Sequence, residues 1–128
     1  MNKPPVLDAS ALIAVLRDEE GAATVVAQLN GAIISSVNLC EVIYKAIDRG
    51  ALIETVMANL RNLPITTIAF DDEQAVIAAS IHQVTHKKGI SFADRACLSL
   101  GILKDRKVWT SDKKWEKLDV GADVELFR

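Results

Sequence analysis

The sequence has few of the residues and segments that mark several large classes of protein. Its two cysteines, Cys40 and Cys97, form no Cys-x-x-Cys or Cys/His spacing, which argues against a zinc site or a thioredoxin-like motif. Both stand in apolar stretches, where we expect them to be buried as small hydrophobic side chains. No apolar run approaches the roughly 18 residues of a membrane span, and the N-terminal residues lack the pattern of a signal peptide. We therefore expect a cytoplasmic protein with no membrane association.

Charge of one sign is also lacking, because 15 basic and 17 acidic residues leave a formal net charge of −2 and an isoelectric point near 5.6. This balance argues against a surface that coats nucleic acid broadly, since such a surface is usually basic. A local basic rim is still compatible with it, although an ordinary solvated surface explains the late basic residues more simply. These residues are Arg95, Lys104, Arg106, Lys107, Lys113 and Lys114.

Hydrophobic residues make up 50% of the chain, which is enough for a core, and 128 residues fit one domain over residues 1–128. Short apolar runs alternate with segments of helical periodicity. Continuous Val/Ile/Leu runs are typical of parallel strands that are covered on both faces. We therefore predict an α/β fold, a three-layer α/β/α domain with a mostly parallel central sheet. The expected strands cover residues 6–7, 32–34, 65–70, 107–110 and 124–127, and the expected helices cover 10–17, 22–30, 37–49, 53–63, 72–86, 92–103 and 113–117.

Four acidic residues stand where this topology would bring distant segments together. Asp8 directly follows the first strand, and Asp112 closely follows the strand that ends at Thr110. Glu41 and Asp94 lie in the first turns of helices. Ligands of open α/β sheets bind at the carboxyl ends of the strands. We therefore expect these four carboxylates to converge at that edge of the sheet.

Each acid also has a purely local explanation. Asp8 and Asp112 stand where a side chain caps a helix or a negative charge favours its N-terminus. Ser91-x-x-Asp94 has the spacing of a capping box, and Asn38-x-x-Glu41 would have it too, with Asn38 as the cap. Capping and convergence are both compatible with the sequence.

Convergence would have a chemical consequence. Two carboxylates about 5 Å apart repel by roughly 3 kcal/mol at an effective dielectric near 20, so four of them need a cation or a proton. Ligation by oxygen alone favours Mg²⁺ or Mn²⁺ over zinc, and such an ion activates water and neutralises charge on a phosphodiester. We therefore predict phosphodiester hydrolysis. Ser10, Thr110 and Ser111 would orient ligands or water, although Ser111 suits a helix cap at least as well.

Four blocks of the sequence resemble those of PIN domains. Residues 6–12 (VLDASAL) resemble the opening of these domains, an apolar strand that ends in Asp-x-Ser. Residues 35–42 (SSVNLCEV) and 91–98 (SFADRACL) are similar to the second and third blocks, and the third is the most specific match. Residues 108–112 (VWTSD), followed by Trp115, resemble the fourth. The blocks come in the family's order over nearly the whole chain, which in its small size looks most like the VapC-type toxins.

The resemblance implies an endoribonuclease that depends on Mg²⁺ or Mn²⁺ and cuts tRNA or ribosomal RNA. It also implies the toxin of a type II toxin–antitoxin system, blocked by a VapB-type antitoxin and commonly a homodimer. The acids that would be both catalytic and metal-binding correspond to Asp8, Glu41, Asp94 and Asp112. Our candidates for RNA contacts are Arg95, Lys113 and Lys114.

Two other functions compete with this hypothesis. The first is a catalytically idle PIN-like module that binds RNA or a partner. The second is a phospho-receiver domain, which the sequence disfavours because Asp8 is followed by Ala9-Ser10 instead of a second acid.

Two further features have modest interpretations. The apolar side chains between residues 37 and 63 pack in the core or line a dimer or antitoxin interface. His82 and His86 lack the flanking ligands of a metal motif, so we expect them at the surface.

Overall fold

The computed structural model describes residues 3–128, and its centre is a sheet of five short strands in the order β3-β2-β1-β4-β5. Every strand pair is parallel, with Val6 of β1 opposite both Ile33 of β2 and Val108 of β4. The predicted parallel α/β fold is confirmed. The strands are β1 (Val6–Leu7), β2 (Ile33–Ser35), β3 (Thr66–Ile68), β4 (Val108–Thr110) and β5 (Val124–Leu126).

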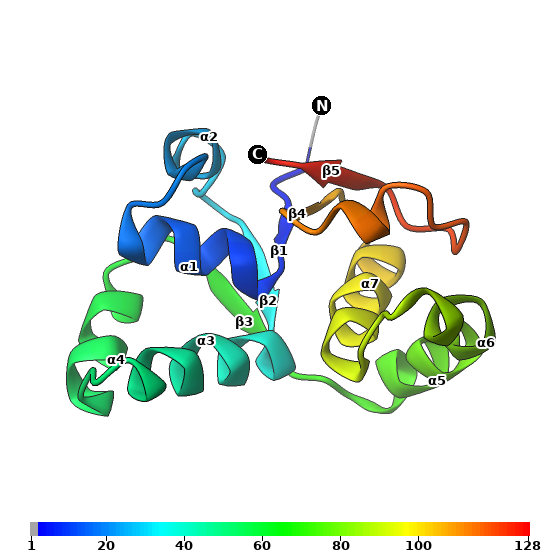
Figure 1. The fold of residues 1–128 in the computed structure, drawn as a ribbon, viewed down its shortest axis with the longest axis horizontal. Coiled ribbons are helices and arrows are strands. Elements are labelled where there is room, and N and C mark those ends of the chain that lie inside the picture. Colours follow the sequence, from blue (N-terminus) through cyan, green and yellow to red (C-terminus); the bar gives the residue numbers. More distant parts are fainter. Residues whose placement is uncertain (1–2) are drawn as a thin grey trace.

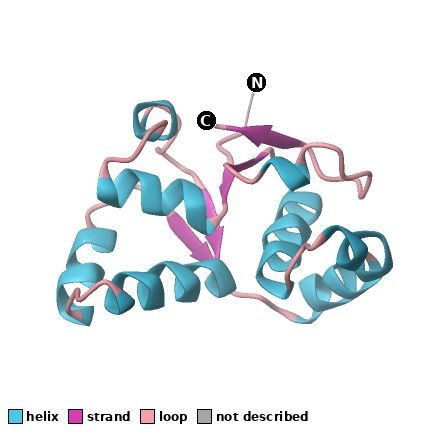
Figure 2. Cartoon of the chain, viewed as in Figure 1, coloured by secondary structure: helices cyan, strands magenta, loops and turns pink. Residues whose placement is uncertain are grey.

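Helices cover both faces of the sheet (Figures 1 and 2). One face meets α1 to α4, and the other meets α5 to α7. Successive strand residues point to opposite faces, so Val6 packs with the α7 side and Leu7 packs with α1. The helices are α1 (Ala9–Arg17), α2 (Ala22–Val26), α3 (Ser36–Asp48), α4 (Ile53–Arg61), α5 (Asp72–Ser80), α6 (His82–Thr85) and α7 (Phe92–Lys104), with 3-10 turns η1 (His86–Lys88) and η2 (Lys113–Trp115).

The prediction of a single helix over residues 72–86 is wrong in one respect, because the helix is interrupted at Ile81. Next to the break, the hydroxyl of Ser80 donates to the carbonyl of Ile77, and that of Thr85 donates to the carbonyl of Ile81. Side-chain hydroxyls that bond to nearby carbonyls compete with the helix ladder and bend it. Helix α2 is also shorter than expected, because after Val26 the amides of Gln28 and Leu29 donate to carbonyls three residues earlier and not four. The chain then turns at Gly31, with φ of 84°, to enter β2.

Helix α7 approaches β4 very closely at Gly101. A Cβ atom added there would collide with the Cγ2 of Val108, so the packing depends on the absence of a side chain. Helix α7 also carries Asp94 in its first turn, so this close packing helps to position that carboxylate. Glycine is therefore used here for close packing and not for a turn.

One of the two cysteine predictions is wrong. Cys97 is buried in α7, as expected, but Cys40 is exposed. Helix α3 buries Val42, which lies two residues further along and therefore on the opposite side of the helix from Cys40.

The apolar residues between 37 and 63 are only partly buried, and the two histidines lie at the surface. Val56 and Leu60 of α4 are buried in the core, whereas Ile47, Leu52 and Ile53 are exposed. The two histidines are exposed, as expected, with their rings stacked. Within residues 3–128, no helix is both long and apolar enough to cross a membrane.

Candidate active site

Asp8 is the most buried of the four acids and stands at the carboxyl end of β1, with only 7% of its surface exposed. Its Oδ1 accepts hydrogen bonds from the Ser10 hydroxyl at 2.6 Å and from the Ala11 amide at 3.0 Å, so it caps α1. Its Oδ2 accepts from the Thr110 hydroxyl at 2.6 Å. Burial raises the pKa of Asp8 to about 6, although these hydrogen bonds lower it and the charge of Asp94 adds to the rise. Asp8 therefore caps a helix and also stands at the carboxyl edge of the sheet, as the sequence predicts.

Glu41 projects from α3, which begins after β2 and is capped by Ser35. The predicted cap at Asn38 is therefore wrong, because helix α3 starts earlier than expected. Glu41 Oε2 lies 3.0 Å from the Lys45 Nζ, one helical turn further on. Burial opposes the charge on Lys45, but the hydrogen bond to Glu41 raises the pKa of Lys45 overall.

Asp94 lies in the first turn of α7, where it completes the predicted capping box with Ser91. Its Oδ2 accepts from the Ser91 amide at 2.9 Å, and the Ser91 hydroxyl accepts from the Asp94 amide. Burial raises the pKa of Asp94, and the charges of Asp112 and Glu41 raise it further. These charge effects are consistent with the position of the three carboxylates, which line one cavity.

Asp112 follows β4 and caps η2, since its Oδ1 accepts from the Lys114 amide at 3.0 Å. Its own amide donates to the Thr110 hydroxyl oxygen at 3.1 Å. That hydroxyl in turn donates to Asp8, so one buried threonine ties the loop after β4 to the end of β1. Ser111 adds a second tie, because its amide donates to the Ser10 hydroxyl at 3.1 Å.

The four carboxylates meet in one cavity of about 240 Å³. Figure 1 shows why, because the starts of α1, α3 and α7 gather beside the carboxyl ends of β1 and β2. Thr110, which has no exposed surface, does not line this cavity but contacts Asp8, which does. The cavity, hereafter the acidic cavity, is lined by Asp8, Ala9, Ser10, Asn38, Glu41, Lys45, Asp94, Ser111 and Asp112.

Two lining residues, Asn38 and Lys45, were not predicted as site residues from the sequence. Asn38 is 1% exposed, and its Nδ2 donates to the Ala93 carbonyl at 3.0 Å, which joins α3 to the start of α7. Its Oδ1 is buried and has no hydrogen-bond partner among residues 3–128. The signal that would have found both residues is helical spacing, because positions three before and four after Glu41 share its face.

A hard divalent cation fits the donors of the acidic cavity. All four acids supply oxygen. The Oδ1 of Asn38, which has no hydrogen-bond partner in the described part of the chain, is a neutral oxygen that can bind such an ion or accept a hydrogen bond from one of its waters. As the side chains lie, however, no three acidic, His or Cys residues within residues 3–128 form a group close enough to hold an ion. Each carboxylate instead accepts from a local donor, and at least some of these side chains must move closer together to hold an ion.

The candidate RNA contacts lie outside the acidic cavity. Arg95 donates to the Ile90 carbonyl and stacks over the ring of Phe92 at 6.0 Å. Lys114 donates to the Gly89 carbonyl, with its Nζ 4.0 Å from Asp112 Oδ2, and Lys113 is exposed. Of the three, only Lys114 reaches one of the four acids.

The fold and the acidic cavity define a class of small parallel α/β domains with carboxylates at the sheet edge. The sequence profile described as PIN domain matches residues 6–121, so the chain belongs to the PIN domain family. The resemblance drawn from the four sequence blocks is therefore confirmed. No curated protein matches the chain in sequence.

Similar solved structures come from toxin–antitoxin systems. The DNA-bound VapBC of Salmonella typhimurium is 19% identical, with a TM-score of 0.77 and 100% of each chain covered. A toxin–antitoxin complex from Klebsiella pneumoniae is 17% identical, with a TM-score of 0.76, covering 97% of this chain and 98% of that one. VapBC-5 of Mycobacterium tuberculosis is 20% identical, with a TM-score of 0.62 and 97% of each chain covered. At these identities the likeness concerns the fold.

Proposed function

We propose that this chain is a Mg²⁺- or Mn²⁺-dependent endoribonuclease and the toxin of a type II toxin–antitoxin system. The observation that carries the proposal is the acidic cavity, in which acids that follow β1 and β4 meet acids from α3 and α7. Asp8, Glu41, Asp94 and Asp112 are the proposed catalytic and metal-binding residues.

The chain's own residues would prepare this site for an ion. Ser10 and Thr110 hold the Asp8 carboxylate by hydrogen bonds to its two oxygens, which fixes its orientation. Asn38 fixes the start of α7, and with it Asp94, against the helix that carries Glu41. A bound divalent cation supplies an activated water and neutralises charge on the phosphodiester.

The proposed partners follow from the family and from the similar structures. Those structures are described as toxin–antitoxin or VapBC complexes, which supports a VapB-type antitoxin for this chain. We further propose tRNA or ribosomal RNA as the substrate, a homodimer as the assembly, one domain over residues 1–128 and the cytoplasm as the place of action.

RNA cleavage by purified protein tests the proposal. We expect discrete cuts in total tRNA or ribosomal RNA with Mg²⁺ or Mn²⁺, none with EDTA and none by Asp94→Asn, with ends mapped by sequencing. The amide oxygen that this substitution introduces can still accept from the Ser91 amide, so the capping box is kept and the fold should be unchanged. Asp105→Asn is the matched control, because Asp105 lies at the other end of α7 with its side chain 99% exposed.

The same experiment separates the nuclease from an idle module. Binding of RNA without cuts, by folded protein free of antitoxin, would support the idle PIN-like module. Cuts that persist in Asp94→Asn would show that the activity comes from elsewhere and would remove the catalytic assignment.

A further inference from the structure

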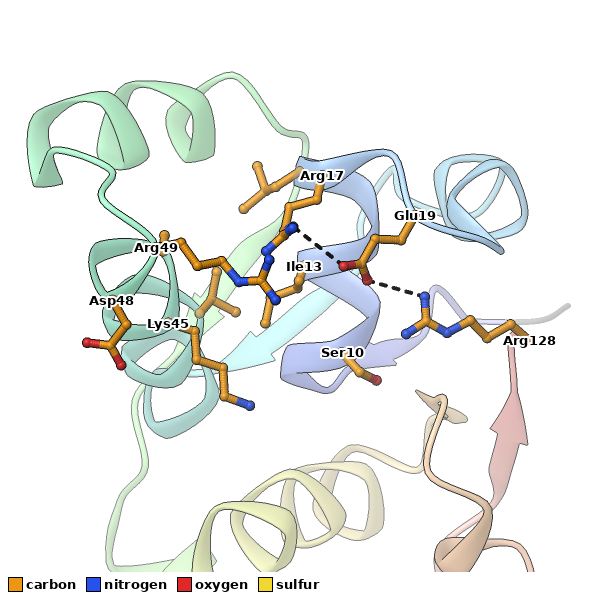
Figure 3. A pocket seen from close by; sticks show the side chains of 11 residues that line it. Ser10, Ile13, Arg17, Glu19, Lys45, Asp48, Arg49 and Arg128 are labelled. Atoms are coloured by element: carbon orange, nitrogen blue, oxygen red, sulfur yellow. Dashed lines mark hydrogen bonds and ion pairs between the residues drawn. The ribbon is translucent and has the colours of Figure 1, made fainter.

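A second cavity, of about 430 Å³, lies between α1 and α3 and adjoins the acidic cavity. Ser10 and Lys45 line both, so the two cavities are neighbours. Its apolar wall comes from Ile13, Leu16 and Val42. Figure 3 shows the polar side chains that surround the opening. We call this space the α1–α3 cavity.

The α1–α3 cavity is cationic, although the chain as a whole has a net charge of −2. Four basic side chains line it, against two acidic ones. Glu19 is occupied, because it pairs with Arg17 at 3.5 Å and with Arg128 at 3.2 Å. Asp48 points to the outer side of α3 in Figure 3. The two basic residues that remain are Lys45 and Arg49.

Lys45 and Arg49 differ in their ion pairs. Lys45 pairs with Glu41 of the acidic cavity, whereas Arg49 forms no ion pair within the described part of the chain. They stand four residues apart on α3 and its C-terminal cap, so they share one face of the helix. One face of α3 and its cap therefore carries two cationic side chains in a row, and the row begins next to Glu41 of the acidic cavity.

We propose that the α1–α3 cavity binds phosphates of the RNA strand next to the bond held in the acidic cavity, with Lys45 and Arg49 as the contacting residues. The inference rests on the proposed nuclease function and adds the path of the substrate. A strand with one phosphodiester at the carboxylates must place its neighbouring phosphates nearby, where acidic groups would repel them and cationic groups attract them. Guanidinium and ammonium groups are the usual partners of phosphate oxygens.

RNA binding by catalytically inactive protein tests this proposal. Arg49→Gln and Lys45→Gln are made in the Asp94→Asn background, together with Lys87→Gln as a charge-matched control. Lys87 is exposed in η1, which directly follows α6, and α6 lies across the molecule from α1 and α3 (Figure 1). The probes are fluorescently labelled total tRNA and a mixed-sequence oligoribonucleotide, and affinity is measured by anisotropy over a range of salt concentrations.

We expect Arg49→Gln and Lys45→Gln each to weaken binding about fivefold, a modest value because both side chains are partly solvated. The slope of log affinity against log salt should fall by about 0.7 for each phosphate of a single strand that the variant no longer neutralises. Lys87→Gln should change neither quantity. Circular dichroism and melting curves check that the variants fold.

Several outcomes overturn the proposal. Unchanged affinity and salt slope in Arg49→Gln, while the parent protein cuts RNA, would refute the RNA path and leave the nuclease intact. Weaker binding with an unchanged slope would show that the substitution acts by distortion. Oligoglutamate that binds in an Arg49-dependent way, while RNA does not, would make the cavity a site for an acidic peptide. Failure of the parent to cut or bind any RNA would refute both proposals together.

Discussion

Replacing Asp8 with asparagine should make the metal-free protein more stable while it destroys the metal site. Asp8 is almost completely buried, and its pKa rises from 3.8 to about 6 mainly because burial disfavours its charge. The folded protein therefore binds the Asp8 proton more tightly than the unfolded chain does. The free energy of unfolding should fall as the pH rises from about 4 to about 6, and the loss should be complete above that range.

The size of the effect follows from the same two values. A rise from 3.8 to about 6, at 1.36 kcal/mol per pH unit, corresponds to roughly 3 kcal/mol at neutral pH. Asparagine has no charge to bury, but its amide would face the Thr110 hydroxyl that now donates to Asp8, which costs about 1 kcal/mol. We therefore expect a net gain of about 1–2 kcal/mol, or a melting temperature higher by about 3–10 °C.

Thermal unfolding in EDTA at pH 7 and at pH 4 measures this difference. The gain should appear at pH 7 and largely vanish at pH 4, where the parent carries a neutral Asp8. Mg²⁺ should stabilise the parent but not Asp8→Asn. A variant that is less stable than the parent at pH 7 in EDTA would show that burial of the Asp8 charge is not costly, and the reasoning from its raised pKa would fail.

Further predictions concern metal binding and the packing of the core. Mg²⁺ at ten times its dissociation constant should stabilise the parent by about 1.4 kcal/mol and leave Asp94→Asn unshifted, and an equal shift in both would place the ion elsewhere. Lys45→Met should bind Mg²⁺ about fivefold tighter by calorimetry, because Glu41 loses its competing partner; weaker binding would contradict this. Gly101→Ala should cost about 1–3 kcal/mol in urea unfolding, since α7 must move away from Val108. Leu12→Ala should cost about 2–5 kcal/mol, whereas Leu52→Ala, on an exposed residue, should change stability little.

Much of the fold was predictable because its signals are local. The Val/Ile/Leu runs at β1 and β2 form strands that are buried on both faces, as parallel strands between helix layers must be. The Ser91–Asp94 spacing predicted the capping box at the start of α7. The break at Ile81 was missed, because hydroxyl bonds to the helix backbone leave the apolar pattern unchanged.

The candidate site was only partly predictable for a related reason. The positions of Asp8, Glu41, Asp94 and Asp112 follow from topology, because acids after parallel strands and at the helix starts beside them share one edge. Asn38 and Lys45 escaped notice, since an asparagine and a lysine on an amphipathic helix ordinarily face water. The contact of Asn38 with Ala93 exists only once α3 packs beside α7. The Lys45–Glu41 pair is local to α3, but only the packing of the other segments places it at the acidic cavity.

The sequence by itself determined the strands, most of the helices, the family blocks and which acids stand at the carboxyl edge of the sheet. Apolar periodicity, caps and short motifs carry that information over a few residues at a time. Only the tertiary structure decided the burial of Asp8, the bond between Asn38 and α7 and the cationic α1–α3 cavity beside the acids. Burial and charge depend on which distant segments pack together, and no short stretch of the chain specifies that packing.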